Sequence, residues 1–149
     1  FRVERTATVK APPEKVFALI ADFRAWTRWS PWEGLDPALK RTHSGAASGK
    51  GAVYAWEGNS QVGQGRMEIV EATAPAKVAI DLQFIKPYAA RNVVEFSLQP
   101  KGGETAVTWA MHGPNQFIGK VMSVFMSMDR MIGKNFEDGL AALKSAAEK

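Results

Sequence analysis

Two histidines are the first candidates for chemistry, because imidazole most readily acts as a base or binds a metal near neutral pH. His43 and His112 lie far apart in the sequence, and neither belongs to an HxxxH or HExxH pattern. That spacing is what brings two metal ligands to one face of a helix. A lone histidine is more often a hydrogen-bonded structural residue, so we expect no catalytic residue, no zinc or iron site and no cofactor.

Nucleophiles and phosphate-binding loops are also missing from the sequence. The chain has no cysteine, which excludes thiolate nucleophiles, thiolate metal sites and disulfides. It contains neither GxSxG nor GxGxxG, and the GKG at Gly49–Gly51 lacks the rest of a phosphate-binding loop. Hydrolase and nucleotide chemistry therefore have little support.

The polar side chains that remain as candidates share no signature motif: Arg41, His43, Tyr54, Asn92, Trp109 and His112. Groups of this kind orient a carbonyl or hydroxyl in an apolar small-molecule site. They also assist a cyclisation, when a pocket folds a reactive chain and a few donors polarise a carbonyl. The sequence leaves both roles open.

The N-terminal region changes its hydrophobic period once. Apolar and polar residues alternate from Arg2 to Lys10, which predicts a half-buried strand. From Ala11 to Phe23, two prolines near the start and apolar residues on one face predict a short amphipathic helix. A second helical turn, Arg24 to Arg28, should end before Pro31, because a residue that precedes proline avoids helical angles.

The rest of the chain predicts strands and then one long helix. Alternating runs separated by turn residues predict about six antiparallel strands, at 38–43, 52–57, 61–71, 77–85, 92–99 and 105–112. From Asn115 to the end, apolar residues recur three or four apart, which predicts a long C-terminal helix. Glycine weakens a helix, so we expect a kink or break near Met131 to Gly133.

This order of elements has one simple arrangement, an α+β fold in which a curved antiparallel sheet of about seven strands grips the final helix in its concave face. Gly63 and Gly65 lie inside a predicted strand and mark a place for the sheet to bend. A length of 149 residues with 46% hydrophobic and 23% charged residues suits one soluble domain, residues 1–149.

Strand alternation assigns the two faces of the sheet. The concave set is Tyr54, Trp56, Met67, Ile69, Val78, Ile80, Leu82, Phe84, Val94, Phe96, Leu98, Val107, Trp109 and Met111. The opposite set is polar, as expected for a face in contact with water: Glu57, Arg66, Glu68, Asp81, Gln83, Glu95 and Ser97.

Four segments resemble the START and birch-pollen-allergen superfamily, and more narrowly its polyketide cyclase/dehydrase-like branch, SRPBCC. They are APPEKVFALIADFRAWTRWSPWE, GAVYAWEGNSQVGQGRMEI, TAVTWAMHG and MDRMIGKNFEDGLAALK. The resemblance implies a helix-grip fold with a pocket between the sheet and the C-terminal helix. It also implies ligands such as lipids, polyketides, sterols or other apolar molecules.

With that pocket in mind, the concave set and the apolar stripe of the helix predict its lining. The lining residues are Tyr54, Trp56, Met67, Leu82, Phe84, Phe96, Trp109, Met111, Val121, Phe125, Met128 and Ile132. The rim is assigned to Trp29, Trp32 and His112. Methionine adapts to varied apolar partners, which suits such a pocket. Any one of these residues alone is more often core than ligand contact.

The tryptophans of WTRWSPW have two interpretations, a structural plug or a binding platform. Trp26 and Trp29 are three residues apart and point the same way, so we expect them to clamp the core, with a ligand lid as the alternative. Pro31 stops the helix and turns Trp32 into the following loop, which makes Trp32 the best candidate for a mobile rim residue.

The sequence favours one function and leaves two others open. The leading interpretation is a noncatalytic domain that binds or carries a small hydrophobic or amphipathic molecule. A polyketide aromatase/cyclase-type enzyme is the first alternative. An accessory domain whose exposed rim binds a protein partner is the second.

The net charge and the start of the chain give less information about function. The net charge of +4 comes from scattered basic residues, and we do not expect nucleic-acid binding. The chain starts at Phe1 in a predicted strand, so we expect an upstream segment that has been removed, and relatives of the resembled family often carry a hydrophobic one. A signal peptide or anchor there would bring the domain near a membrane or export it. The sequence fixes neither the localisation nor the oligomeric state.

Overall fold

The computed structural model describes residues 2–34, 36, 38–59, 62–86, 89–113 and 121–149, and describes only the helical backbone for 121–129. The helices are α1 (Pro13–Ala21), the 3-10 helices η1 (Phe23–Arg28) and η2 (Pro31–Gly34), and α2 (Val121–Ala147). The strands are β1 (Arg2–Val9), β2 (Lys40–Gly45), β3 (Ala52–Glu57), β4 (Gln64–Thr73), β5 (Lys77–Lys86), β6 (Ala90–Lys101) and β7 (Glu104–His112).

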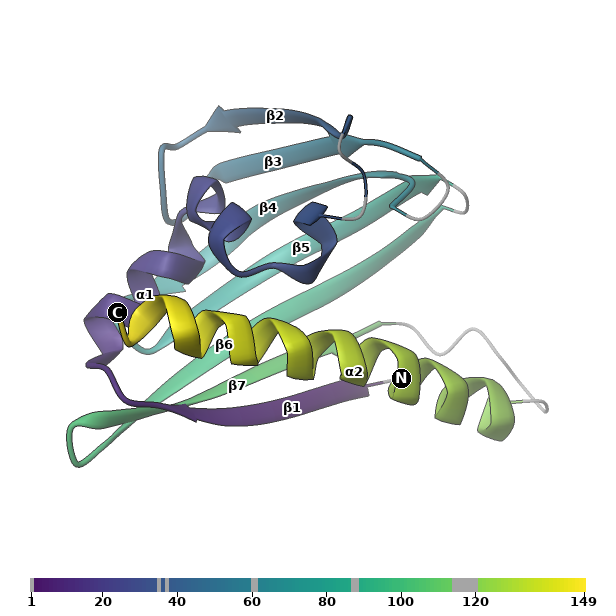
Figure 1. The fold of residues 1–149 in the computed structure, drawn as a ribbon. Helices are drawn as coiled ribbons and strands as arrows, with labels where there is room; N and C mark the ends of the chain where they lie inside the picture. Colours follow the sequence, from purple (N-terminus) through teal and green to yellow (C-terminus); the bar gives the residue numbers. More distant parts are fainter. Residues whose placement is uncertain (1, 35, 37, 60–61, 87–88, 114–120) are drawn as a thin grey trace.

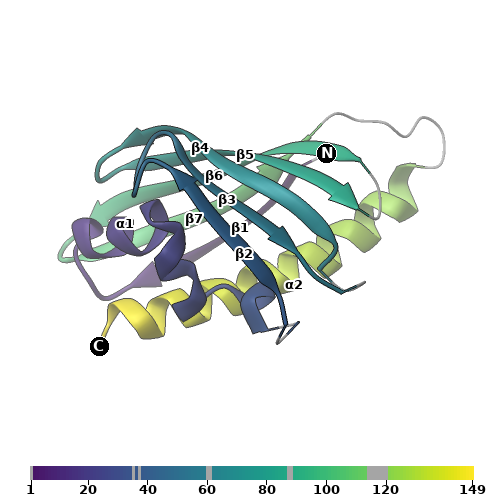
Figure 2. The same ribbon diagram turned by 90° about the horizontal axis from the view of Figure 1, so that it is seen from above.

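One antiparallel sheet contains all seven strands of the described residues, in the order β1-β7-β6-β5-β4-β3-β2. Helix α2 crosses the concave face of this sheet, and α1 packs near its C-terminal end (Figure 1). The view from above shows the sheet bent along α2 (Figure 2). The predicted helix-grip α+β fold is confirmed.

Strand register confirms the predicted faces. Tyr54 faces Met67, which faces Leu82, which in turn faces Asn92, so these four side chains form one row across the concave side. Further along the strands, Val78, Phe96, Trp109 and Arg5 form a parallel row. The register of β4 shifts near Gly65 and again near Ile69, where the sheet bends.

The predicted break at Met131 to Gly133 is wrong, because α2 is one continuous helix from Val121 to Ala147. Its predicted start at Asn115 lies outside the described residues. A Cβ at position 133 would meet the guanidinium of Arg5, whose Nε donates to Glu137 of α2 at 2.9 Å. Gly133 therefore makes room for a contact between α2 and the edge strand, and the cost of one glycine does not interrupt a helix held by packing.

Candidate functional site

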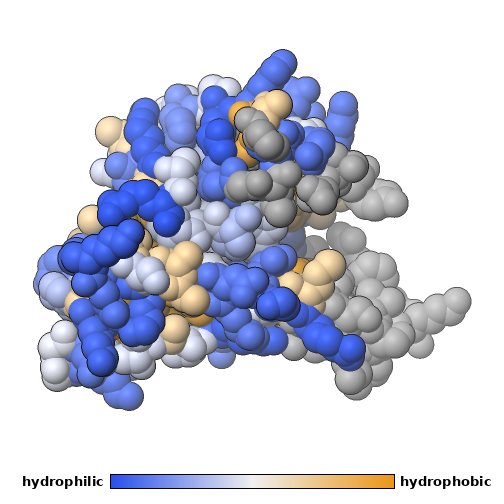
Figure 3. Space-filling view, in the orientation of Figure 1, coloured by the Kyte–Doolittle hydropathy of each residue, from blue (hydrophilic) through white to orange (hydrophobic). Residues whose placement is uncertain are grey.

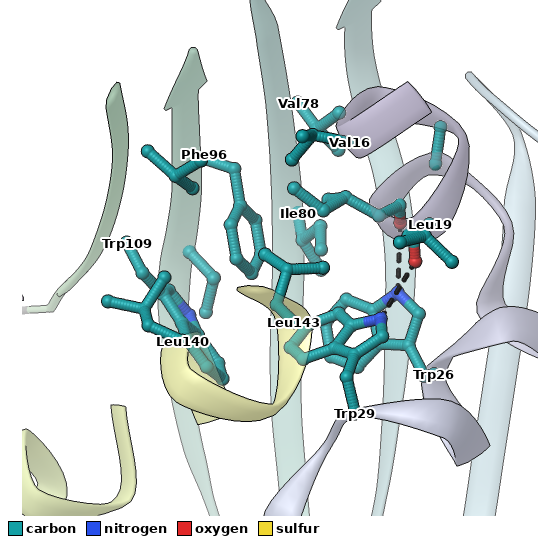
Figure 4. Packing of buried hydrophobic residues seen from close by; sticks show 14 of the residues in the cluster. Val16, Leu19, Trp26, Trp29, Val78, Ile80, Phe96, Trp109, Leu140 and Leu143 are labelled. Carbon is teal, nitrogen blue, oxygen red and sulfur yellow. Dashed lines mark hydrogen bonds between the residues drawn. The ribbon is translucent and has the colours of Figure 1, made fainter. Parts of the chain in front are cut away.

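Aromatic rings join the sheet to the C-terminal half of α2. Phe96 stacks on Trp109 at a centroid distance of 4.9 Å, and Trp109 stacks on Phe136 at 4.2 Å. The close approach depends on Gly139, since a Cβ there would lie 2.6 Å from Cζ3 of Trp109. Leu140 and Leu143 of α2 pack beside this column (Figure 4). We call this region, with Trp26 and Trp29, the packed end of the concave interior.

Trp26 and Trp29 belong to the packed end as a structural plug. Their indole N–H groups donate to the backbone carbonyls of Ile20 and Leu19, each at 2.9 Å (Figure 4). Both side chains are buried, and their rings lie 4.6 Å apart. The plug prediction is confirmed, and Trp29 lies in the core instead of at the predicted rim. The final turn of a helix leaves carbonyls without intrahelical partners, and the two indoles satisfy them.

The other end of the concave interior is more accessible, and we call it the open end. Trp56, Met67 and Phe84 point to the concave side but are only partly buried. The ring of Trp56 lies over Gly65, which has no side chain to block it, and meets Phe84 edge-on at 5.9 Å. The Nε1 of Trp56 donates to the carbonyl of Val62 at 2.8 Å, which fixes the ring.

Two further apolar side chains are only partly buried. Ile132 of α2 and Trp32 of η2 are partly buried and pack against the core. Trp32 meets Trp109 at 5.9 Å and Phe136 at 6.4 Å, both edge-on. The space-filling view shows the surface hollowed between the part of the molecule that carries β2 and β3 and the part that carries α2 (Figure 3). Ile132 and Trp32 therefore pack against the core while part of each side chain stays exposed.

A polar cluster closes the β2–β3 side. The hydroxyl of Tyr54 donates to Oε1 of Glu33 at 2.7 Å, and Nε of Arg41 donates to Oε2 of the same carboxylate at 2.6 Å. Burial of Tyr54, together with the hydrogen bond to Glu33, raises the pKa of its phenol above the ordinary value. The ring of His43 lies edge-on to Tyr54 at 5.1 Å. The phenol of Tyr54 therefore stays protonated, and its O–H group is already used in the hydrogen bond to Glu33.

Three polar groups on the concave side have no hydrogen-bond partner that the structure records within its described residues. Nδ1 of His43 and Nε1 of Trp109 are fully buried. The side-chain amide of Asn92 is the third, on a residue that is only 8% exposed. Such groups usually find a partner in folded proteins, so each is a candidate contact for a ligand or an ordered water.

His112 lies away from this site. Its strand places Met111 on the concave side, so His112 faces the convex side, where Nε2 is 3.0 Å from Oε1 of Glu95. The hydrogen bond to His112, with help from Lys77, lowers the pKa of Glu95. His112 therefore takes no part in the site that we propose below. The alternation that places Met111 inside already implied this position.

The remaining predicted lining residues fall into three groups. Tyr54, Leu82 and Met111 are buried on the concave side, and Phe96 and Trp109 are buried in the packed end. Trp56, Met67, Phe84 and Ile132 are the partly exposed ones. Val121, Phe125 and Met128 lie outside the residues whose side chains are described. That any of these residues contacts a ligand stays a prediction.

Sequence reasoning missed Glu33 and Phe136 as organising residues. Glu33 joins Tyr54 and Arg41, and Phe136 is the helix member of the aromatic column. Phe136 was visible as part of the apolar stripe. Glu33 gave no such signal, because in the sequence it is one acidic residue after Trp32, and only the fold brings it to Tyr54 and Arg41.

The described residues hold no group of three or more histidine, aspartate or glutamate side chains placed to bind a metal ion. Within the same part of the chain, no helix is both long enough and apolar enough to span a bilayer.

Comparison with known families decides what this fold is. Residues 1–148 match the family described as polyketide cyclase/dehydrase and lipid transport. The chain belongs to this family. The SRPBCC resemblance of its sequence is thereby confirmed, and the fold is one that binds hydrophobic ligands. No protein with a curated description matches the chain.

Several solved structures share the fold across nearly the whole of this chain. A Thermobifida fusca protein has a TM-score of 0.73 at 19% identity, with 98% of this chain and 92% of that chain covered. A Chromobacterium violaceum protein has a TM-score of 0.70 at 13% identity, with 99% and 97% covered. DynU16, from the dynemicin biosynthetic locus, has a TM-score of 0.68 at 17% identity, with 99% and 47% covered. Identities this low show the fold alone.

Proposed function

We propose that residues 1–149 act as one domain that binds a small hydrophobic or amphipathic molecule, lipid-like or polyketide-like, at the open end of the concave interior. The observation that carries this proposal is that Trp56, Met67 and Phe84 face the interior yet stay partly exposed. Aromatic side chains on the inside of a sheet are normally covered to full packing density. A concave, mostly apolar surface with few polar groups is typical of small-molecule sites.

The packed end supports this site from behind. Phe96, Trp109 and Phe136 form a column whose rings contact one another, so they make a rigid floor. Trp32 packs edge-on against two rings of that floor, Trp109 and Phe136. A preformed wall lowers the ordering cost of binding, because few side chains must be immobilised when the ligand arrives. The open end then contributes the adaptable contacts, including the flexible thioether of Met67.

The test is to fill the open end. Met67→Trp places a large ring among Trp56, Leu82 and Phe84 and should reduce binding by at least tenfold. Native mass spectrometry followed by extraction identifies molecules that copurify with the wild-type chain, and titration of the extracted compound gives the dissociation constants of the variants.

The matched control is Val70→Trp, on the same strand, because Val70 is exposed and lies at the register shift between Ile69 and Glu71, away from the row of Met67. Wild type and Val70→Trp should bind alike. Equal affinity in Met67→Trp, with its fold intact by circular dichroism, would contradict a site at the open end.

The cyclase alternative gains no support from the polar groups available. Tyr54 already donates its proton to Glu33, and its raised pKa makes it a weaker acid. His112 faces the other side of the sheet. Binding without chemistry therefore remains the function that the geometry supports best.

The partner-binding alternative needs an apolar patch outside the interior. On the convex face the described residues form ion pairs, among them Asp81 with Arg91 and Arg66 with Glu68. The large apolar side chains exposed there are separated, because Val70 lies on β4 near Ile80, whereas Ile85 lies at the far end of β5. Isolated apolar residues are ordinary on a soluble surface.

A further inference from the structure

Asn92 stands at the far end of the concave row that begins at Tyr54. It lies on β6 opposite Leu82, which faces Met67 on the next strand. Only 8% of its surface is exposed, whereas residues next to it along β6, such as Arg91, lie on the exposed side. Three inter-strand spacings of ~4.8 Å separate β6 from β3, so Asn92 and Tyr54 stand ~14 Å apart across apolar side chains.

The side-chain amide of Asn92 has no hydrogen-bond partner that the structure records among its described residues. The amide is not one of the fully buried side-chain atoms that lack a partner, so it keeps contact with solvent from the interior and can exchange that water for a guest. The Tyr54 hydroxyl at the other end of the row already donates to Glu33. Asn92 therefore remains the amide on this row that can both donate and accept a hydrogen bond from a guest.

The charges on the concave side limit which polar group that guest can carry. The guanidinium of Arg41 is held by Glu33, and that of Arg5 is held by Glu137. A carboxylate or phosphate that enters between the described residues would lose its hydration and meet cations that are already paired. An uncharged hydroxyl or carbonyl pays a much smaller desolvation cost and matches the amide of Asn92.

We propose that Asn92 is a specificity-determining residue of the open end, which selects apolar molecules that carry one uncharged hydroxyl or carbonyl group over those that carry a carboxylate. The guest places that group against the amide and extends its apolar body along Leu82 and Met67 toward Trp56. This inference rests on the proposed function and adds the chemical class of the ligand.

The experiment compares decan-1-ol, decan-2-one and decanoic acid at pH 8, with dissociation constants measured by calorimetry on the full chain. The wild type should bind the alcohol and the ketone at least tenfold more tightly than the ionised acid. Asn92→Leu removes the amide at similar volume and should weaken alcohol and ketone binding about tenfold, equivalent to about 1.4 kcal/mol.

The control is Gln99→Leu, the same amide-to-leucine change on the exposed side of β6. It should bind all three compounds as the wild type does. Because Asn92→Leu replaces an unpaired amide with an apolar side chain, it should fold at least as stably.

A second variant keeps the inference testable if leucine is not tolerated. Asn92→Asp retains an acceptor and, when ionised at pH 8, has no donor, so alcohol binding should persist while ketone binding falls about tenfold. The role of Asn92 would be overturned if both Asn92 variants bound the alcohol and the ketone as tightly as the wild type does. It would also be overturned if the wild type bound the acid as tightly as the alcohol. A wild type that binds none of the three compounds would instead overturn the proposed function.

Discussion

The packed end and the open end use the same kinds of residue on the same face of one sheet, yet they differ in what covers them. Over Phe96 and Trp109, helix α2, Trp26 of η1 and the following Trp29 bury the rings. Over Trp56 and Phe84, the described residues leave the rings partly exposed. The chain therefore concentrates its packing at one end, and the other end remains accessible without loss of the fold.

The largest expected difference between the two ends comes from Phe136→Ala against Phe84→Ala. Phe136 is 2% exposed and stacked on Trp109, so its removal leaves a cavity and should lower the free energy of unfolding by ~3–5 kcal/mol. Phe84 is partly exposed, so Phe84→Ala should lower the free energy of unfolding by less than half of that amount. Urea denaturation measures both. Equal losses would remove the distinction between the two ends.

A second and smaller contrast lies within α2 itself. In Gly139→Ala the new Cβ meets Trp109 and Pro31, so overpacking of ~1–3 kcal/mol should outweigh the gain in helix propensity. In Gly133→Ala the new Cβ meets the flexible end of Arg5, which can move aside, and stability should change little. Thermal unfolding that shows Gly139→Ala to be as stable as Gly133→Ala would mean that α2 is not held tightly over the packed end.

The smallest effect concerns the polar edge of the open end. Tyr54→Phe removes the hydroxyl that donates to Glu33 and should cost ~1 kcal/mol near neutral pH. The folded state raises the pKa of Tyr54, chiefly through burial. The stability that depends on its protonated form is therefore full below pH ~10, the ordinary pKa of tyrosine, and is lost as the pH rises further.

The free energy of unfolding of the wild type should accordingly fall toward that of Tyr54→Phe as the pH rises above ~10. Urea denaturation of both chains at several pH values measures the difference. A difference that stays constant or grows over that range would show that Tyr54 is not held in its protonated form.

Much of the site was predictable, and the parts that were not have a common cause. Alternation placed Tyr54, Met67 and Phe84 on the concave face correctly, because side-chain direction in a strand is local. It did not distinguish Phe96, which is sealed, from Phe84, which is accessible. Trp29 was placed at the rim because its spacing gave only a direction, and its depth depends on the carbonyl of Leu19.

The sequence by itself determined the order of strands and helices, the two faces of the sheet and the tryptophan plug, since each follows from hydrophobic period and turn residues over a few positions. Only the tertiary structure decided which concave residues stay accessible, which partner Glu33 serves, and that α2 continues through Gly133. Those outcomes depend on which elements stack over one another, and segments distant in the chain settle that through packing that no local pattern encodes.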